Sequence, residues 1–475
     1  MKYVIIGNGI IALSTAFRLT QQIKAKDSIA IVGPSARIGS ATMAAGAMLN
    51  SFAEINPYSL RTKTGRYHFE LSRLATKKWP EFENQLNSAA GNKSTKNDSY
   101  GLGTYIINNT SSDDFDDRNF EAIVNVLKDC NEQFDYVTPR DIPNYHPSQR
   151  KRATRAIYIP GEGWLNPKIV LSRLDHILKN HPQVNYIDDT VLRLIKNGSA
   201  IEAIDIAKGK RVEGDMFLLA NGASAGDVLK SSELKLKIQT LFYGVGVSLE
   251  IHSEGFSHKK CIRTPNRGGG CGIYSLPHYL GPNKSNEHIM IGATNYISPN
   301  PRYNPRLSGV EGLMKNAIEE INNNFYAATL VNINVGWRPT TQDTYPLLGK
   351  TSINNFVIAT GTKRDGFQLS PVISEMIASI MLGNEVDAKF DCYKPEREII
   401  REINRKDAVE MIVSGLMSEH YQHDYNPPNV KMNAQVIETH RKEIEELHDR
   451  IGAYDWGIPQ ELVPMYRRGH ARFNK

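Results

Sequence analysis

The chain begins with an apolar run that leads directly into a glycine-rich turn, and this feature constrains its fold more than any other. Residues 3–6 are largely apolar, and Gly7-Asn-Gly9-Ile-Ile-Ala12 follows them. The run is typical of a buried parallel strand, and G-x-G-x-x-A is typical of the turn from such a strand into a helix. Gly7 permits the tight turn, Gly9 lets a pyrophosphate approach the backbone, and Ala12 allows the helix to pack closely on the strand. We therefore predict a dinucleotide site in an α/β unit; the alternative is a glycine turn in an ordinary unit of that class.

Composition narrows the class of protein. The 475 residues are enough for two or more domains, and the net charge of +6 permits an anionic cofactor without indicating nucleic-acid binding. No apolar run is long enough for a membrane span. Lys2 before an apolar stretch is compatible with an export signal, but the two glycines and the lack of a small-residue cleavage site argue against export. The four cysteines show neither a C-x-x-C pair nor a metal-ligand spacing, which favours a reducing cytoplasm.

The second predicted strand, residues 28–33, lacks the acidic residue that usually follows it in dinucleotide folds. Asp or Glu at this point binds the adenosine ribose, but here the chain reads Gly33-Pro34-Ser35. We expect the Ser35 hydroxyl to take this place and Arg37 to approach a phosphate. The alternative is that Gly33-Pro34 only terminates the strand.

A run of small residues follows at positions 38–50, Ile-Gly-Ser-Ala-Thr-Met-Ala-Ala-Gly-Ala-Met-Leu-Asn. Small side chains allow a flat, bulky group to lie against the backbone. They also allow two helices to pack closely, and the sequence does not decide between these readings.

Two later segments repeat the pattern of an apolar strand ending at glycine: residues 215–224 and residues 355–361. A loop at 362–368 and an amphipathic helix ended by Gly383 follow the second one. Both ends of the chain should therefore contribute to one sheet, with another domain between them. Beyond residue 394 we predict two charged helices, at 395–421 and 435–451, that form an appendage packed on the body or on a partner; the alternative is a solvated tail.

The remaining segments complete the expected order of elements. We predict strands at 100–107, 184–187, 191–195 and 200–207, and helices at 121–133, 168–179 and 308–323. We predict a surface loop at 87–98, a solvated acidic loop at 111–117, a turn at 158–166 and a loop at 298–307.

Taken in order, these motifs resemble the D-amino-acid oxidase family of flavoproteins, which includes glycine and sarcosine oxidases. The motifs are GNGIIA, GSATMAAGAML, GEGWLNP, LLANGAS, GWRPTTQDTYPLLG and TGTKRDGFQLSP, and they span about residues 1–385. The resemblance implies an α/β fold with a Rossmann-like FAD-binding domain, an interleaved α+β substrate domain and a C-terminal helical appendage. The expected boundaries are 1–85, 150–235 and 336–390 for the FAD-binding domain, 86–149 and 236–335 for the substrate domain, and 391–475 for the extension.

The resemblance also implies bound FAD and assigns residues to it. No cysteine near Arg338 suggests a covalent link, so we expect FAD to be held non-covalently. The implied positions are Gly7, Gly9 and Ala12 at the pyrophosphate; Thr42, Ala44, Ala45 and Gly46 beside the isoalloxazine ring; Val191 near the adenine; Asn221 and Gly222 near the phosphates; and Gly361, Gly366, Phe367 and Gln368 at the pyrimidine edge.

Arg338, within Gly-Trp-Arg-Pro, matches the arginine that clamps the substrate carboxylate in the family. A planar guanidinium suits bidentate binding of a carboxylate, although a structural arginine is the alternative. Tyr243 and Tyr274 are candidates to face the flavin, or are core tyrosines. Lys363 and Arg364 replace the small or histidine residues common at that loop, and we expect both to face solvent.

The implied activity is oxidation of the C–N bond of a small-molecule amine or amino acid by hydride transfer to flavin N5. A specialised biosynthetic role is compatible with the unusual tail. The alternatives are a flavin dehydrogenase that passes electrons to a partner and a non-catalytic FAD-binding subunit of a complex. The charged C-terminal helices suit a protein partner or a second copy of the chain.

Overall fold

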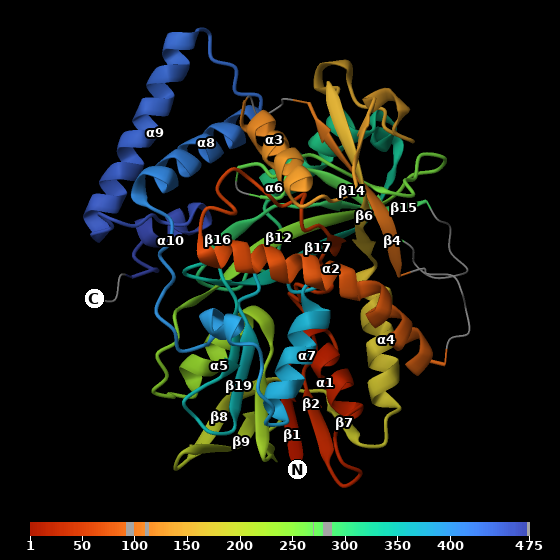
Figure 1. Cartoon of the computed structure of the whole chain (residues 1–475), viewed down its shortest axis with the longest axis vertical. Helices are drawn as coiled ribbons and strands as arrows, with labels where there is room; N and C mark the ends of the chain where they lie inside the picture. The colour runs from red at the N-terminus through yellow and green to blue at the C-terminus, as the bar shows by residue number, and fades with distance from the viewer. Residues whose placement is uncertain (92–98, 110–113, 269, 279–286, 473–475) are drawn as a thin grey trace.

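The computed structural model describes residues 1–91, 99–109, 114–268, 270–278 and 287–472. Its two large sheets lie one above the other in Figure 1, and a third, small sheet packs beside the lower one. Within the described part of the chain no helix is both long and apolar enough to cross a membrane.

The lower sheet contains the glycine-rich turn at the end of its central strand. Its order is β18 (Leu347–Lys350), β19 (Phe356–Thr360), β11 (Met216–Leu219), β1 (Lys2–Ile6), β2 (Ser28–Val32) and β7 (Val184–Ile187). All neighbours are parallel except β18 and β19. Strands from residues 2–6 and 356–360 thus share one sheet, which confirms the prediction that both ends of the chain build it.

Helices cover both faces of this sheet. On one face α1 (Ile10–Thr20), α2 (Lys63–Ala89), α4 (Pro167–Lys179) and α7 (Ser370–Met381) bury apolar residues against β1 and β2. On the other face lie α5 (Ala225–Ser231) and a small antiparallel sheet of β8 (Val191–Asn197), β9 (Ala200–Ile206) and β10 (Arg211–Glu213). β1 is buried on both sides, as its unbroken apolar sequence requires.

The upper sheet has ten strands and is mostly antiparallel. Its main path is β16 (Tyr296–Ser298), β12 (Leu241–His252), β15 (His288–Gly292), β14 (Tyr274–Pro277), β13 (Cys261–Arg263), β4 (Tyr100–Asn108), β6 (Arg155–Leu165) and β3 (Met48–Leu49). β17 (Thr329–Thr341) pairs with β12, and β5 (Asp135–Val137) pairs with β6. Helices α3 (Asp114–Asp129) and α6 (Leu307–Asn316) belong to this half of the molecule.

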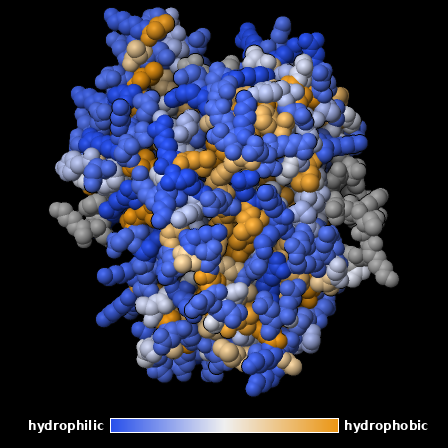
Figure 2. Space-filling view, viewed as in Figure 1, coloured by the Kyte–Doolittle hydropathy of each residue, from blue (hydrophilic) through white to orange (hydrophobic). Residues whose placement is uncertain are grey.

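The C-terminal extension packs on the body rather than standing free. Helices α8 (Arg405–Gln422) and α9 (Val430–Ile451), the single turn η7 (Gln460–Leu462) and α10 (Val463–Arg467) bury an apolar cluster that includes Phe242 and Ile297 of the body. Figure 1 shows this extension beside the upper sheet, and Figure 2 shows that α8 and α9 present mostly hydrophilic residues on the same face. The predicted appendage is therefore confirmed, and the alternative of a solvated tail is excluded.

The predicted turn at 158–166 is also wrong, because most of it belongs to the continuous strand β6. Gly163 is explained by close approach to β4, since a Cβ there would lie 2.0 Å from the Gly101 carbonyl oxygen. Glycine here permits contact between backbones and not reversal of the chain.

The predicted acidic loop at 111–117 is wrong where the structure describes it. Asp114, Asp116 and Asp117 form the first turn of α3, where carboxylates interact favourably with the helix N-terminus. Asp116 is fully buried and pairs with Arg267 at 3.0 Å, so it is not solvated. Residues 111–113 lie outside the described residues.

Smaller differences concern where elements begin and end. Residues 87–89 of the predicted loop at 87–98 complete α2, and residues 92–98 lie outside the described part of the chain. The predicted helix 308–323 is α helical only to Asn316 and continues as a π-helical turn over Ala317–Ile321. α8 begins only at Arg405, because Asn404 caps it by accepting a hydrogen bond from the Asp407 amide at 2.8 Å.

Candidate functional site

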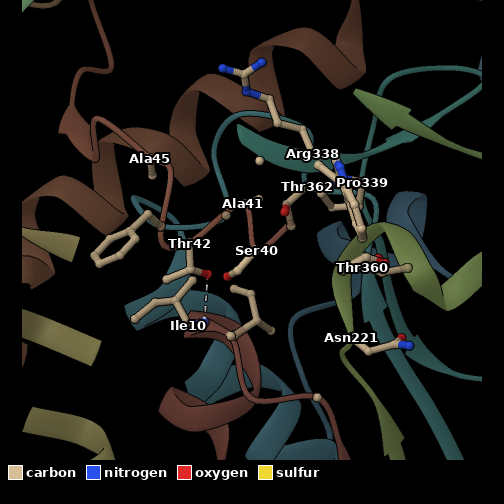
Figure 3. Close-up of a pocket in the computed structure, with 18 of the residues that line it drawn as sticks. Ile10, Ser40, Ala41, Thr42, Ala45, Asn221, Arg338, Pro339, Thr360 and Thr362 are labelled. Atoms are coloured by element: carbon tan, nitrogen blue, oxygen red, sulfur yellow. Dashed lines mark hydrogen bonds between the residues drawn. The ribbon is translucent and has the colours of Figure 1, made fainter. Parts of the chain in front are cut away.

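A cavity of about 600 Å³ lies at the carboxyl ends of β1, β11 and β19 and extends to β12 and β17 of the upper sheet. Figure 3 shows its lining, with Ile10 and Arg338 towards opposite ends of the view. Most residues assigned to the cofactor or the substrate line it. They are Gly7, Gly9, Thr42, Ala44, Ala45, Gly46, Val191, Asn221, Gly222, Tyr274, Arg338, Gly366, Phe367 and Gln368.

The glycine turn after β1 is built as its sequence predicts. Gly7 has a φ of +118°, and a Cβ at this position would lie 2.5 Å from the carbonyl oxygen of Ala220. A Cβ on Gly9 would lie 3.2 Å from Thr42 Oγ1, which accepts a hydrogen bond from the Ile10 amide at 3.1 Å. Gly7 therefore lets the turn pack against the end of β11, and Gly9 keeps the N-terminus of α1 open to the cavity, which suits an anionic group.

Residues around the cavity fit a dinucleotide. The Asn221 side-chain oxygen is buried and has no hydrogen-bond partner among the described residues. Small residues of the 40–48 segment form one wall, and a Cβ on Gly46 would lie 2.4 Å from the Tyr274 hydroxyl oxygen. An unpaired polar atom at one end and a smooth wall at the other match the polar and flat parts of FAD.

Five assigned residues lie outside the lining. Ala12 is fully buried, in keeping with its predicted packing role. Gly361 has a φ of +74° and forms the turn after β19, where a Cβ would lie 2.8 Å from Thr341 Cγ2. Tyr243 lies behind the wall, and its hydroxyl donates to the carboxylate of Asp227, which does line the cavity.

Ser35 and Arg37, the two residues expected to serve the adenosine end, are engaged elsewhere. The backbone N–H and the hydroxyl of Ser35 donate to the carboxylate of Asp188 at 2.7 and 2.9 Å. The guanidinium of Arg37 makes two hydrogen bonds, of 2.7 and 2.6 Å, to Asp175 of α4. The structure does not bring these two side chains to the cavity; Pro34, Thr190 and Leu192 line it in that region together with Val191.

Arg338 extends from β17 across β12. A Cβ on Gly246 would lie 2.2 Å from Arg338 Nη1, so glycine at this position makes room for the guanidinium. Nη1 donates to the carbonyl oxygen of Thr294 at 2.9 Å and to Asn295 Oδ1 at 3.1 Å. Nε and Nη2 have no hydrogen-bond partner among the residues that the structure describes. The guanidinium thus keeps two donor nitrogens, Nε and Nη2, for a ligand in the cavity.

Lys363 and Arg364 do not face solvent, contrary to the prediction. Both line the cavity, with side chains 17% and 19% exposed. Lys363 adopts a φ of +52° and its N–H donates to the Pro339 carbonyl at 2.8 Å, which folds the loop back against β17. Lys363 Nζ then lies 2.6 Å from a carboxylate oxygen of Glu461 in the extension.

Arg364 lies in a charged cluster on the same wall. Its Nη1 donates to Cys271 Sγ at 2.9 Å, and its Nη2 lies 3.6 Å from a carboxylate oxygen of Glu54. Burial by itself would raise the pKa of Glu54, but Arg263 and Arg364 lower it to about 2. Glu54 is therefore ionised and balances one of the cations of the wall.

Sequence reasoning missed Glu54, Cys271 and Thr360 as members of this site. A signal existed for Thr360, because it ends the second of the two strands that lead into glycine. Its hydroxyl donates to the Gly222 carbonyl at 2.8 Å and so ties together the two later glycine turns. No local pattern marked Glu54 or Cys271.

A family model described as FAD dependent oxidoreductase matches residues 2–380. The chain belongs to this family. The fold class and the FAD cofactor implied by the resemblance are thereby confirmed, and the extension lies beyond the matched residues.

Relatives of known name agree with this assignment. The chain is 24% identical over 400 residues to glycine oxidase of Bacillus licheniformis, a match that covers 83% of this chain and 97% of the relative. Its fold resembles that of glycine oxidase from Geobacillus kaustophilus, with a TM-score of 0.68, 19% identity, and coverage of 84% and 99% of the two chains. It also resembles iminodiacetate oxidase from Chelativorans sp. BNC1, with a TM-score of 0.67, 18% identity, and coverage of 83% and 100%.

Proposed function

We propose that this FAD-dependent oxidoreductase oxidises the C–N bond of an amine or amino acid that carries a carboxylate. The observation that carries the proposal is Arg338, whose guanidinium reaches the cofactor cavity with Nε and Nη2 free of partners among the described residues. The names of the relatives, glycine oxidase and iminodiacetate oxidase, both denote enzymes that act on amino carboxylates. Bound FAD supplies the hydride acceptor for such an oxidation.

The residues of the cavity have separate tasks in this proposal. The turn Gly7–Gly9 and Asn221 hold the phosphates and ribose side of FAD, and the Ala44–Gly46 wall accepts its ring. Arg338 binds the substrate carboxylate and so fixes the substrate carbon against the ring. The Tyr274 hydroxyl, buried above Gly46, closes the site against water.

We also propose that FAD is held non-covalently. Cys271 is the cysteine that lines the cavity, and its sulfur accepts a hydrogen bond from Arg364. Denaturation by acid or heat should release all of the FAD from the chain, and Cys271→Ser should not change the amount released. Flavin that remains with the precipitated chain would contradict this.

The four described cysteines are free thiols, which supports a reducing compartment, and we propose the cytoplasm.

The experiment that tests the function is anaerobic bleaching of the holoprotein by a panel of amines and amino acids, followed by kinetics of Arg338 variants. Arg338→Lys keeps the charge and loses the planar fork, so kcat/KM should fall about ten- to a hundred-fold. Arg338→Ala should lose more, while FAD content and spectrum stay unchanged. Unchanged kinetics in Arg338→Ala would overturn the proposal, and a parallel loss of FAD would make the arginine structural.

Measuring oxygen consumption by the same preparation shows whether oxygen or another acceptor reoxidises the reduced enzyme. Peroxide release at the rate of turnover identifies an oxidase. Rapid bleaching without oxygen consumption identifies a dehydrogenase, and a flavin that no amine reduces identifies a non-catalytic subunit.

A further inference from the structure

Three cationic side chains line the cofactor cavity, and they are not equivalent. Arg364 lies against Glu54, and Lys363 pairs with Glu461. Arg338 has no carboxylate partner among the described residues, and its protein contacts are the Thr294 carbonyl and the Asn295 amide oxygen. Its position therefore depends on how Asn295 is held.

Asn295 is held by the C-terminal extension. Its Nδ2 donates to Glu461 Oε2 at 3.0 Å, while its Oδ1 accepts from Arg338 Nη1 at 3.1 Å. An asparagine amide can turn either its oxygen or its nitrogen towards a neighbour. Because Arg338 only donates, Asn295 must present its oxygen, and the acceptor on the other side of the amide makes that orientation the stable one.

Glu461 is itself rigidly placed. It lies in η7, whose neighbours Leu462 and Met465 are fully buried in the apolar core of the extension. Gly415 of α8 makes room for the adjacent Gln460, since a Cβ there would lie 1.8 Å from Gln460 Nε2. The Glu461 side chain is only 15% exposed. Burial by itself would raise its pKa, but Lys363 and Arg364 lower the pKa, so the carboxylate is ionised at neutral pH.

We propose that Glu461 is a positioning residue for the substrate site, which fixes the Asn295 amide so that Arg338 turns Nε and Nη2 to the substrate carboxylate. The extension, which lies beyond the residues matched by the family, thereby completes the site. This inference rests on the proposed function of Arg338.

A thermodynamic cycle on the holoprotein tests it, with acetate as the probe carboxylate and the flavin absorption spectrum as the readout. Arg338→Ala should raise the Kd for acetate about ten- to a hundred-fold, and Glu461→Ala should raise it about ten-fold. Glu461→Ala should add nothing in the Arg338→Ala background, because it acts through the arginine. A change that persists there overturns the inference: a higher Kd would mean that Glu461 acts on the fold, and a lower Kd would mean that it acts through Lys363, its partner at 2.6 Å in the same cavity.

The outcomes separate this inference from the function on which it rests. If Arg338→Ala weakens acetate binding and Glu461→Ala does not, Glu461 has no positioning role, but Arg338 still binds the carboxylate. If Arg338→Ala binds acetate like the wild type, or if the wild type shows no acetate binding, the proposal that Arg338 binds the substrate carboxylate is wrong.

Two further variants provide controls. Glu461→Gln keeps a side-chain oxygen for Asn295, so its Kd for acetate should stay within about three-fold of the wild-type value. A rise in Kd equal to that of Glu461→Ala would overturn the positioning role of Glu461. Glu410 lies in the same extension and pairs with Arg441 at 2.9 Å, away from the cavity. Glu410→Ala should bind acetate like the wild type, and an equal loss in this variant would mean that the extension acts only through stability.

Discussion

Gly9 borders the opening at the start of α1, and its substitution tests where the phosphates of FAD lie. A Cβ there already falls 3.2 Å from Thr42 Oγ1, and the branches of a valine would project into the opening at the start of α1. Gly9→Val should therefore abolish FAD binding in a chain that still folds. Gly312→Ala is a suitable control, because its Cβ would meet its nearest neighbour, His423, at an ordinary 3.7 Å. Full flavin content in the valine variant would show that the cofactor is bound elsewhere.

Glu162 makes stability depend on pH. It is 2% exposed, and its Oε1 accepts from the amides of Phe52 and Ala53 at 2.5 and 3.4 Å. Burial raises the pKa of this carboxyl from 4.5 to about 7, against the hydrogen bond from Phe52. The folded state holds this proton more tightly than the unfolded state does. The contribution of Glu162 to the free energy of unfolding is therefore complete below pH 4.5 and is lost as the pH rises to about 7.

Glu162→Gln removes this titration. The stability of the variant relative to wild type should rise by about 2–3 kcal/mol between pH 4.5 and pH 7. Denaturation of both holoproteins at several pH values across this window measures the difference. A difference that stays constant with pH would show that the folded state does not raise the pKa of Glu162.

At the scale of elements, one buried arginine joins segments that are distant in sequence. Arg267 pairs with Asp116 of α3 at 3.0 Å and with Glu320 of the π-helical turn at 2.8 Å, and the three side chains are at most 1% exposed. Arg267→Met would leave two carboxylates buried without their cation, so it should destabilise the protein by about 3–5 kcal/mol in chemical denaturation. Arg441→Met removes an ion pair on the surface of the extension and should change the midpoint little. Equal midpoints for the two variants would contradict the structural role of the triad.

Features that depend on neighbouring residues could be predicted from the sequence, whereas features that depend on contacts between distant residues could not. The β1 turn and the later strands that end at glycine obey local rules, and the residues of these motifs meet around one cavity as expected. The strand β6 is not predictable from local rules, because Gly163 is required by contact with Gly101, a residue in a different strand. Lys363 resembles a solvated loop residue until Glu461, almost a hundred positions later, is placed beside it.

At the scale of the whole molecule, the extension should be separable from the cofactor. Truncation after residue 394 removes the partners of Phe242 and Ile297, each fully or largely buried, and exposing such side chains costs about 1.5–3 kcal/mol each. The truncated chain should retain FAD, because the lining of the cavity lies within residues 6–368, but its thermal midpoint should fall. The measurement is FAD per chain against the melting midpoint, and a folded truncation with an empty flavin site would contradict this prediction.

The position of β1 between β2 and β11, with β19 one strand further, has a consequence for synthesis on the ribosome. The strand β1 leaves the exit tunnel long before its sheet is complete, because residues 356–360 follow it by about 350 positions. At about 5–20 residues per second, this delay lasts about 20–70 s. During that time an apolar strand lacks some of its neighbours, so the nascent chain should depend on chaperones and should acquire FAD only after residues 356–368 have been translated.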